Sequence, residues 1–208
     1  MAELFVKNII QESVDTKLKN KNMELLAKEK DFYTNIVRAL DEIDKKWRKY
    51  DGLIIGGTHE PEDNEEKIKA IQKARENNIP FLGICMGMQL MAVESARHVL
   101  MIRTADSREV NPRTPNPIIV KMPELRVGIK KVNGRLESHW HNYTFNNNYL
   151  DLFKAFGYEF VMTDDIVEEI RHPRHPHFVG VQYHPEYQSI KDQPHPILRD
   201  FLYACKKL

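Results

Sequence analysis

The sequence contains only two cysteines in 208 residues, which is too few for a disulfide framework. It has no run of about 18 apolar residues that could span a membrane, and its start lacks the basic and apolar stretches of a secretory signal. An excess of one charge is also missing, because 31 Lys and Arg residues oppose 30 Asp and Glu residues. We therefore expect a cytoplasmic protein with no membrane span and no basic surface for nucleic acid.

The chain does contain enough apolar sequence for one core. Hydrophobic residues make up 41% of it, and 208 residues is the length of one domain with a short appendage. Residues 1–22 have little hydrophobic pattern, so we expect an arm or linker there. Residues 23–208 are expected to form the folded domain, although 23–27 fit a strand and a helix about equally well.

Short apolar runs alternate with helical patterns in the first half of the chain. Residues 52–57 and 79–84 are predicted to be buried strands, because each run is apolar and closed by glycine or a turn. The apolar spacing predicts helices over 31–47 and 88–100, with another that ends at Asn77. This alternation predicts a mostly parallel central sheet with helices on both faces.

The second half of the chain has a different pattern. Three prolines within 111–117 indicate a connecting loop. The apolar segments that follow are joined by short turns, which favours antiparallel or mixed strands in an α/β fold. These strands are expected at 118–122, 143–145, 158–162, 166–170 and 178–183, with a final helix at 197–206.

Cys85 lies in the sequence Gly83-Ile-Cys-Met-Gly87, where a predicted strand meets a predicted helix. A nucleophile on such a turn has a strained backbone, and flanking glycines leave room for it. The N-terminus of the following helix favours a thiolate, and N–H groups of the turn can bind an oxyanion. The pattern alone fits a catalytic nucleophile and a buried structural cysteine about equally.

A second motif, Gly180-Val-Gln-Tyr-His-Pro-Glu186, places His184 and Glu186 two residues apart at the end of an apolar strand. Residues with this spacing share one face of a strand, so Glu186 can orient the imidazole of His184. His184 can then take the proton of Cys85 and later protonate a leaving amine. Together the three residues predict a Cys–His–Glu catalytic relay.

These motifs resemble those of the class I glutamine amidotransferases, and most of all the glutaminase domain of CTP synthases. The resemblance implies that Cys85 attacks the side-chain amide of glutamine, forms a γ-glutamyl thioester and releases ammonia, after which water releases glutamate. It implies no cofactor, and a substrate that is glutamine or another γ-glutamyl amide. The matching segments are 74–89, 96–99, Ser107 with Glu109, 139–143 and 177–186.

The resemblance also implies a substrate site. Gln89 and Glu109 match positions that hold glutamine in the family, and a carboxylate at 109 suits the ammonium group of glutamine. A glycine turn after the first strand supplies an oxyanion donor in the family. The predicted substrate-binding residues are Gly56, Gly57, Met86, Gly87, Gln89, Glu109, Asn142 and Tyr143.

Two departures from the family pattern concern the substrate and the partner. CTP synthases have an arginine before the residue that matches Tyr143, and it holds the α-carboxylate of glutamine, whereas Asn142 stands here. Losing such a bond costs about 1.5–3 kcal/mol, roughly 10- to 100-fold in affinity, unless Arg126, Lys130 or Arg135 replaces it. The N-terminal arm is also too short for the synthetase domain that uses the ammonia, so we expect any acceptor to be a separate protein.

Three functions therefore stay open. One is hydrolysis of glutamine with delivery of ammonia to a separate synthetase. Another is a stand-alone γ-glutamyl hydrolase for a larger γ-glutamyl amide, which the missing arginine favours. The last is a binding or regulatory relative without turnover, which the set of Cys85, His184 and Glu186 argues against.

Several histidines lie close together in the sequence, as metal ligands often do. A proline-rich turn accounts for one group and a family segment for the other, so we expect no metal. These histidines are His139, His141, His172, His175 and His177.

Overall fold

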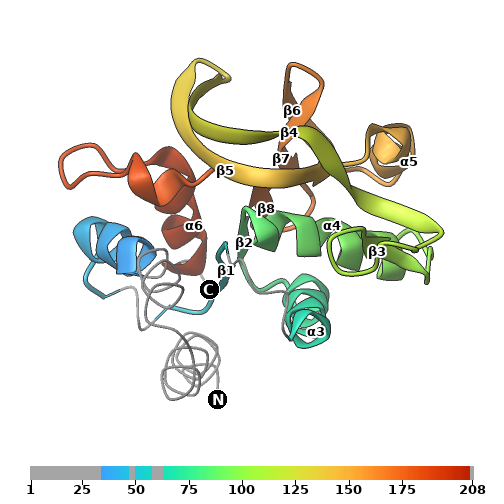
Figure 1. Ribbon diagram of the computed structural model, residues 1–208. Helices are drawn as coiled ribbons and strands as arrows, with labels where there is room; N and C mark the ends of the chain where they lie inside the picture. The colour runs from blue at the N-terminus through green and yellow to red at the C-terminus, as the bar shows by residue number, and fades with distance from the viewer. Residues whose placement is uncertain (1–33, 47–49, 58–62, 207–208) are drawn as a thin grey trace, which may run out of the picture.

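The computed structural model describes residues 34–46, 50–57 and 63–206 (Figure 1). Its central sheet has five strands in the order β1-β2-β8-β7-β6. β1, β2 and β8 are parallel, and β7 and β6 continue the sheet antiparallel. The predicted α/β fold with antiparallel strands from the C-terminal half is confirmed. The strands are β1 (Leu53–Ile55), β2 (Phe81–Ile84), β6 (Glu159–Thr163), β7 (Ile166–Arg171) and β8 (Phe178–Val181).

Helices cover both faces of this sheet, as predicted. α3 (Asn64–Glu76) and α4 (Met86–His98) pack on one face. A helix over 34–43 and α6 (Pro196–Lys206) pack on the other. The sheet therefore has a hydrophobic core on each face. Side chains alternate along β1, so Leu53 and Ile55 belong to the core under α3 and α4, and Ile54 belongs to the core under α6.

Glycines let α4 lie close against the sheet. A Cβ atom on Gly83 would lie 2.5 Å from the backbone of Gly87, and one on Gly180 would lie 2.6 Å from the side chain of Met88. A Cβ atom on Gly87 itself would overlap the carbonyl group of Ile55. The N-terminus of α4 is thereby held at the carboxyl ends of β1 and β2.

A second sheet contains β3 (Ala105–Ser107), β4 (Asn116–Val132) and β5 (Arg135–Phe145). β4 and β5 form a long antiparallel hairpin that arches over the central sheet (Figure 1). The sequence predicted only the two ends of this hairpin, 118–122 and 143–145. The middle was not predicted because its polar residues are buried and its apolar residues are exposed, the reverse of the usual strand pattern. Glu137 and His139 are buried, whereas Leu136 and Trp140 are exposed.

Other differences concern the ends of elements and short elements. α4 begins at Met86 instead of residue 88, and β8 ends at Val181 instead of 183. The short helix α5 (Leu150–Ala155) was not predicted. The expected arm over 1–22 and the segment 23–27 lie outside the described residues. No helix among the described residues is long and apolar enough to cross a membrane.

Candidate active site

Cys85 occupies the sharp turn between β2 and α4, as its motif predicted. Its φ of 53° and ψ of −107° lie in a region that residues other than glycine rarely adopt. Such a backbone costs about 1–3 kcal/mol and persists only where the surroundings enforce it. Here the Cys85 N–H donates a 2.7 Å hydrogen bond to the carbonyl of Val181, which ties the turn to β8.

His184 and Glu186 are in direct contact and buried. The distance from Nδ1 of His184 to Oε1 of Glu186 is 2.8 Å. The local geometry differs from the prediction, because β8 ends at Val181 and Pro185–Tyr187 forms the 3₁₀ turn η3. Pro185 cannot donate to a strand ladder, so a tight turn brings the two side chains together instead of a shared strand face.

The imidazole of His184 also lies next to Cys85, whose thiol is one of the groups that raise the pKa of His184. The turn after β1 packs over this pair. A Cβ atom on Gly57 would lie 2.9 Å from Cε1 of His184 and 3.4 Å from Cβ of Cys85. Glycine at position 57 therefore lets the backbone approach both groups closely.

The charge of His184 follows from its neighbours. Burial alone would lower the pKa of the imidazole, but the Glu186 carboxylate and then the Cys85 thiol raise it to about 10. His184 is therefore an imidazolium at neutral pH. A cation beside sulfur favours the thiolate, which is the nucleophilic form of cysteine.

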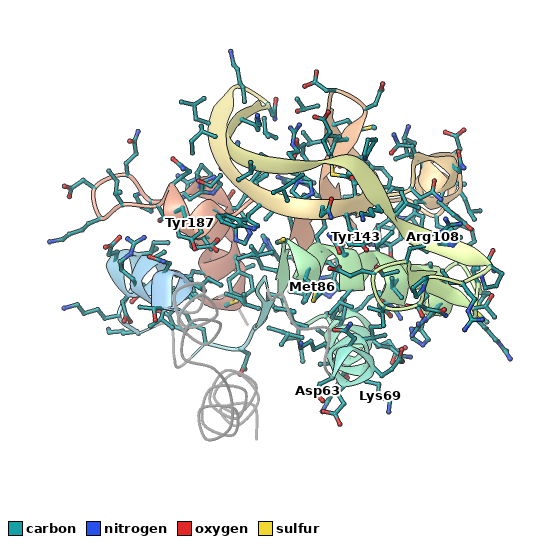
Figure 2. All side chains as sticks on the ribbon, viewed as in Figure 1. Asp63, Lys69, Met86, Arg108, Tyr143 and Tyr187 are labelled. Atoms are coloured by element: carbon teal, nitrogen blue, oxygen red, sulfur yellow. The ribbon has the colours of Figure 1, made fainter. Side chains whose placement is uncertain are left out.

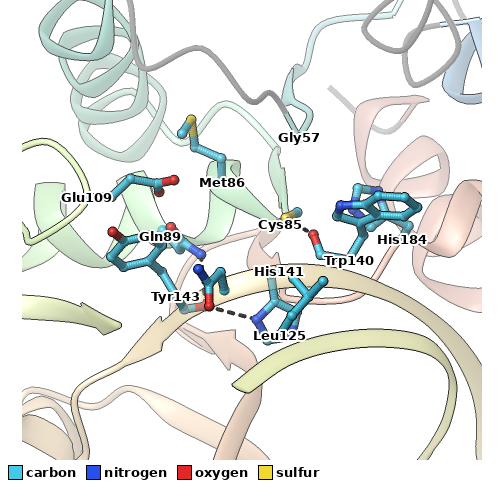
Figure 3. Close-up of a pocket in the computed structure, with 11 residues that line it drawn as sticks. Gly57, Cys85, Met86, Gln89, Glu109, Leu125, Trp140, His141, Tyr143 and His184 are labelled. Carbon is cyan, nitrogen blue, oxygen red and sulfur yellow. Dashed lines mark hydrogen bonds between the residues drawn. The ribbon is translucent and has the colours of Figure 1, made fainter. Parts of the chain in front are cut away.

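A pocket of about 110 Å³ opens above Cys85 (Figure 3). Pockets that hold drug-sized ligands measure roughly 300–1,000 Å³, so the enclosed part of this pocket suits a group the size of one amino acid side chain. It lies between α4, which carries Met86, and the hairpin, which carries Tyr143 (Figure 2), and both residues line it. The lining residues are Gly57, Cys85, Met86, Gln89, Glu109, Leu125, Trp140, His141, Asn142, Tyr143 and His184.

Most of the substrate-binding residues predicted from the sequence line this pocket. Gly56 and Gly87 are the exceptions: neither lines it, and Gly87 packs against the backbone of Ile55 instead. Leu125 and His141 also line the pocket, although their sequence pattern did not mark them as pocket residues. Leu125 is 52% exposed on a stretch of β4 that was not expected to be a strand, so no pattern pointed to it.

Gln182 is a further residue of the site and was not predicted from the sequence. It is fully buried, and its Nε2 donates to Sγ of Cys85 at 3.7 Å. Its Oε1 accepts a 3.4 Å bond from Gln89, which also donates to the carbonyl of Tyr143 at 3.2 Å. A buried amide within the apolar run before His184 was the available signal. These bonds link α4, β5 and the end of β8 around Cys85.

Glu109 supplies a carboxylate to the pocket on the side of Cys85 opposite His184 (Figure 3). Burial raises the pKa of this carboxyl group. Among the described residues, no side chain donates a hydrogen bond or forms an ion pair with it. A carboxylate in this situation is available for a cationic group of a ligand.

The cations considered as replacements for the family arginine are placed elsewhere. Arg126 forms a 2.6 Å ion pair with buried Glu168, and Arg135 pairs with Glu137 and Glu169 at 3.0 and 3.1 Å. Lys130 is exposed on β4. No Lys or Arg of the described part of the chain lines the pocket.

Two further histidine–glutamate pairs lie beneath β5. Nε2 of His139 is 2.9 Å from Glu168, and Nε2 of His195 is 2.9 Å from Glu137. Neither histidine lines the pocket. Within the described residues, no three His, Cys, Asp or Glu side chains are grouped so that they could hold a metal ion.

Comparison with known proteins gives a consistent family. The sequence matches the model of the family Glutamine amidotransferase class-I over residues 8–205. CTP synthases of Halalkalibacterium halodurans and Moorella thermoacetica are each 40% identical to it, over 181 and 184 residues. These matches cover 74% and 75% of this chain and 34% of each relative. The chain thus spans about a third of the length of these relatives.

Solved structures show the same fold. The glutaminase domain of Trypanosoma brucei CTPS with bound acivicin has a TM-score of 0.76 at 21% identity, covering 90% of this chain and 92% of that one. A putative GMP synthase protein of Thermoplasma acidophilum has a TM-score of 0.51 at 19% identity, covering 83% and 79%. Taken with the match over nearly the whole sequence, this chain belongs to the class I glutamine amidotransferase family.

Proposed function

We propose that this chain hydrolyses the side-chain amide of glutamine through a γ-glutamyl thioester on Cys85 and releases ammonia. One observation carries the proposal: Cys85, on a strained turn at the base of a pocket, lies next to His184, and Nδ1 of His184 is bound to buried Glu186. This arrangement activates a sulfur nucleophile and supplies a proton for a leaving amine. A protein that only binds ligands needs none of it.

In the first half of the reaction, the Cys85 thiolate attacks the amide carbon and the C–O π electrons move onto oxygen. The imidazolium of His184 then gives its proton to the amide nitrogen. The C–N bond breaks, ammonia leaves, and a thioester remains on sulfur. Glu186 keeps the imidazole of His184 in the orientation that this transfer needs.

The second half consumes one water molecule. His184, now neutral, takes a proton from water, and the hydroxide attacks the thioester carbon. The C–S bond breaks with its electron pair on sulfur, which restores the thiolate and the imidazolium and releases a carboxylic acid that ionises. Atoms balance as amide plus water giving carboxylate plus ammonium.

Backbone donors would stabilise the oxyanion in both halves. Met86 is the first residue of α4, where N–H groups have no partner within the helix. Gly57 lies against both Cys85 and His184, so its N–H is the candidate for a second donor. Removing one such donor typically costs about 10²- to 10³-fold in rate. Glu109 and Gln89 would hold the rest of the substrate.

We also propose that the ammonia serves an acceptor enzyme, as a separate protein or domain. The similar proteins are CTP synthases, and the matched region is about a third of their length. An amination partner is therefore the class of protein to seek. Release of ammonia that rises when such a partner is added would support this part of the proposal.

The test measures ammonia and glutamyl product from a panel of γ-amides, namely free glutamine, glutaminyl peptides and substituted γ-glutamyl amides. Cys85→Ala is expected to abolish turnover, and an acyl group on Cys85 should be seen by mass spectrometry. Cys205→Ala is the matched control, because Cys205 is buried on α6 away from the pocket. Absence of Cys85-dependent release from every compound would refute the proposal, whereas turnover of substituted amides alone would assign the γ-glutamyl hydrolase function.

A further inference from the structure

The charges that line the pocket do not match free glutamine. At neutral pH the amino acid carries an ammonium and a carboxylate on the same carbon atom. The pocket offers Glu109 for the ammonium, but among the described residues no Lys or Arg faces it. The segment 58–62, which follows Gly57, is Thr-His-Glu-Pro-Glu and also contains no Lys or Arg. The imidazolium of His184 also lines the pocket, but it is bound to Glu186 and lies on the side of Cys85 opposite Glu109. A free α-carboxylate beside Glu109 would therefore be desolvated without a cation next to it.

The remaining wall of the pocket is uncharged. It contains Asn142, whose side-chain amide has no hydrogen-bond partner among the described residues, together with Leu125 and Trp140. An amide presents both a donor and an acceptor. Those are the groups that pair with the N–H and C=O of a peptide bond, and they do not compensate a full negative charge.

An apolar stripe extends from this wall along the outer face of the hairpin. Leu125, Val127 and Ile129 alternate on β4 and so share one face, and Trp140 of β5 lies directly opposite Val127. These four side chains are between 44% and 53% exposed. Exposed apolar surface that is continuous with a ligand pocket usually marks a place where a ligand continues. A single amino acid would leave the stripe uncovered.

We propose that the substrate is an N-terminal glutamine residue of a peptide or polypeptide, in which the α-carboxyl group is part of a peptide bond. The inference rests on the amide hydrolysis proposed above and names its substrate class. Glu109 binds the free α-ammonium, Asn142 binds the first peptide bond, and apolar residues that follow lie along the stripe. The reaction converts the N-terminal glutamine into glutamate.

The chemistry needs only water in addition to the peptide. The C–N bond of the γ-amide breaks, a C–O bond to the water oxygen forms, and ammonia leaves with the proton from His184. The α-amino group and the first peptide bond stay unchanged. The product is one unit more negative than the substrate.

The test compares three compounds that differ in charge: free glutamine, glutaminyl-alanine N-methylamide, and its Nα-acetylated form. We expect glutaminyl-alanine N-methylamide to have a kcat/KM at least about 10-fold above those of free glutamine and the acetylated peptide. Each of these two leaves one charge without a partner, free glutamine its own carboxylate and the acetylated peptide the carboxylate of Glu109. Glutaminyl peptides also cyclise spontaneously with loss of ammonia, so the Cys85→Ala rate is subtracted. Mass spectrometry separates the products, because the glutamyl peptide gains mass and the cyclised peptide loses it.

A charge swap at one position provides the second arm. Asn142→Arg should raise kcat/KM for free glutamine by about 10- to 100-fold and lower it for the peptide. Asn142→Gln, which keeps the amide and adds length, should leave the preference for the peptide in place. Free glutamine hydrolysed as well as the peptide by the unmodified protein would overturn the inference and leave the amidase proposal standing. No Cys85-dependent hydrolysis of any compound would overturn both.

A third arm concerns the stripe. Peptides with leucine after the glutamine should be hydrolysed faster than peptides with aspartate there, and Ile129→Thr should reduce the advantage of longer apolar peptides. Equal rates for all these peptides would remove the stripe from the substrate site and contradict that part of the proposal.

Discussion

The turn around Cys85 and the β4–β5 hairpin face each other across one pocket, yet they are built on opposite principles. The turn is assembled from glycines and buried backbone, so that almost any added atom would clash. The middle of the hairpin buries Glu137 and His139 and exposes Leu136 and Trp140, and a Cβ atom on its Gly128 would meet nothing within 4 Å. The first region holds Cys85 in place by close packing. The second contacts the same site through its backbone, because the carbonyl of Trp140 accepts from Sγ of Cys85 at 3.9 Å and that of Ser138 accepts from the N–H of His184 at 2.8 Å, while its outward side chains stay exposed.

The largest difference in kcat should appear between a variant that breaks the buried His184–Glu186 pair next to Cys85 and one that breaks the buried His139–Glu168 pair under the hairpin. Glu186→Gln removes the carboxylate that holds His184 and is expected to lower kcat by about 10²- to 10⁴-fold. Glu168→Gln breaks the same kind of pair with His139 but should leave kcat of the folded fraction within a few-fold. Rates are measured at matched concentrations of folded protein, and equal losses of kcat would contradict a special role for Glu186.

Replacing a glycine by alanine should change the free energy of unfolding by different amounts in the two regions. Gly87→Ala places a Cβ atom on the carbonyl of Ile55, so α4 must move, and the free energy of unfolding should fall by about 3 kcal/mol. Gly128→Ala meets no neighbour and bears only the cost of its φ of 85°, roughly 1 kcal/mol. Urea unfolding measures both values. A smaller loss for Gly87→Ala than for Gly128→Ala would show that the close packing of α4 is not required.

The pH dependence of stability should trace the imidazolium of His184. Its pKa is raised from 6.5 to about 10 in the folded state, so its contribution is fully present below about pH 6.5 and is lost as pH rises toward 10. A difference of one pH unit between the folded and unfolded pKa corresponds to roughly 1.4 kcal/mol of stability. Urea unfolding between these pH values should therefore show a decline that Glu186→Gln reduces. An unchanged decline in the variant would mean that another group causes it.

Substrate binding should depend on the carboxylate of Glu109. Burial raises its pKa above the ordinary value, so KM should begin to rise with falling pH at a higher pH than for an exposed glutamate. Glu109→Gln should increase KM by roughly 10-fold and remove this pH dependence. The measurement is KM against pH for the best substrate of the panel, and Glu66→Gln on the exposed start of α3 is a suitable control.

The smallest effect is expected on the outer face of the hairpin. Ile129 is 53% exposed, so Ile129→Thr should change the free energy of unfolding by no more than about 0.5 kcal/mol. Ile118, which is fully buried on the same strand, provides the contrast, and Ile118→Thr should be clearly destabilising. A large loss for Ile129→Thr would indicate that the stripe is covered within the folded protein.

The sequence predicted the turn at Cys85 and the proximity of His184 to Glu186 better than the shape of the hairpin above them. Short motifs encode several of these features, which could therefore be predicted from the sequence. They are strands β1 and β2, helix α4 and the contact of His184 with Glu186. The hairpin was not, since its buried Glu137 and His139 have partners distant in sequence, His195 and Glu168, and a polar residue satisfied in this way looks like a surface residue.

By itself, the sequence determined the elbow at Cys85, the alternation of strands and helices, and the family. These properties depend on residues that are close along the chain, such as the glycines around Cys85. Only the tertiary structure decided that Arg126 and Arg135 are paired away from the pocket, that Glu109 stands without a partner among the described residues, and that an apolar stripe continues from the pocket wall. Pairing and exposure depend on segments that are far apart in sequence, and the folded protein alone brings those segments together.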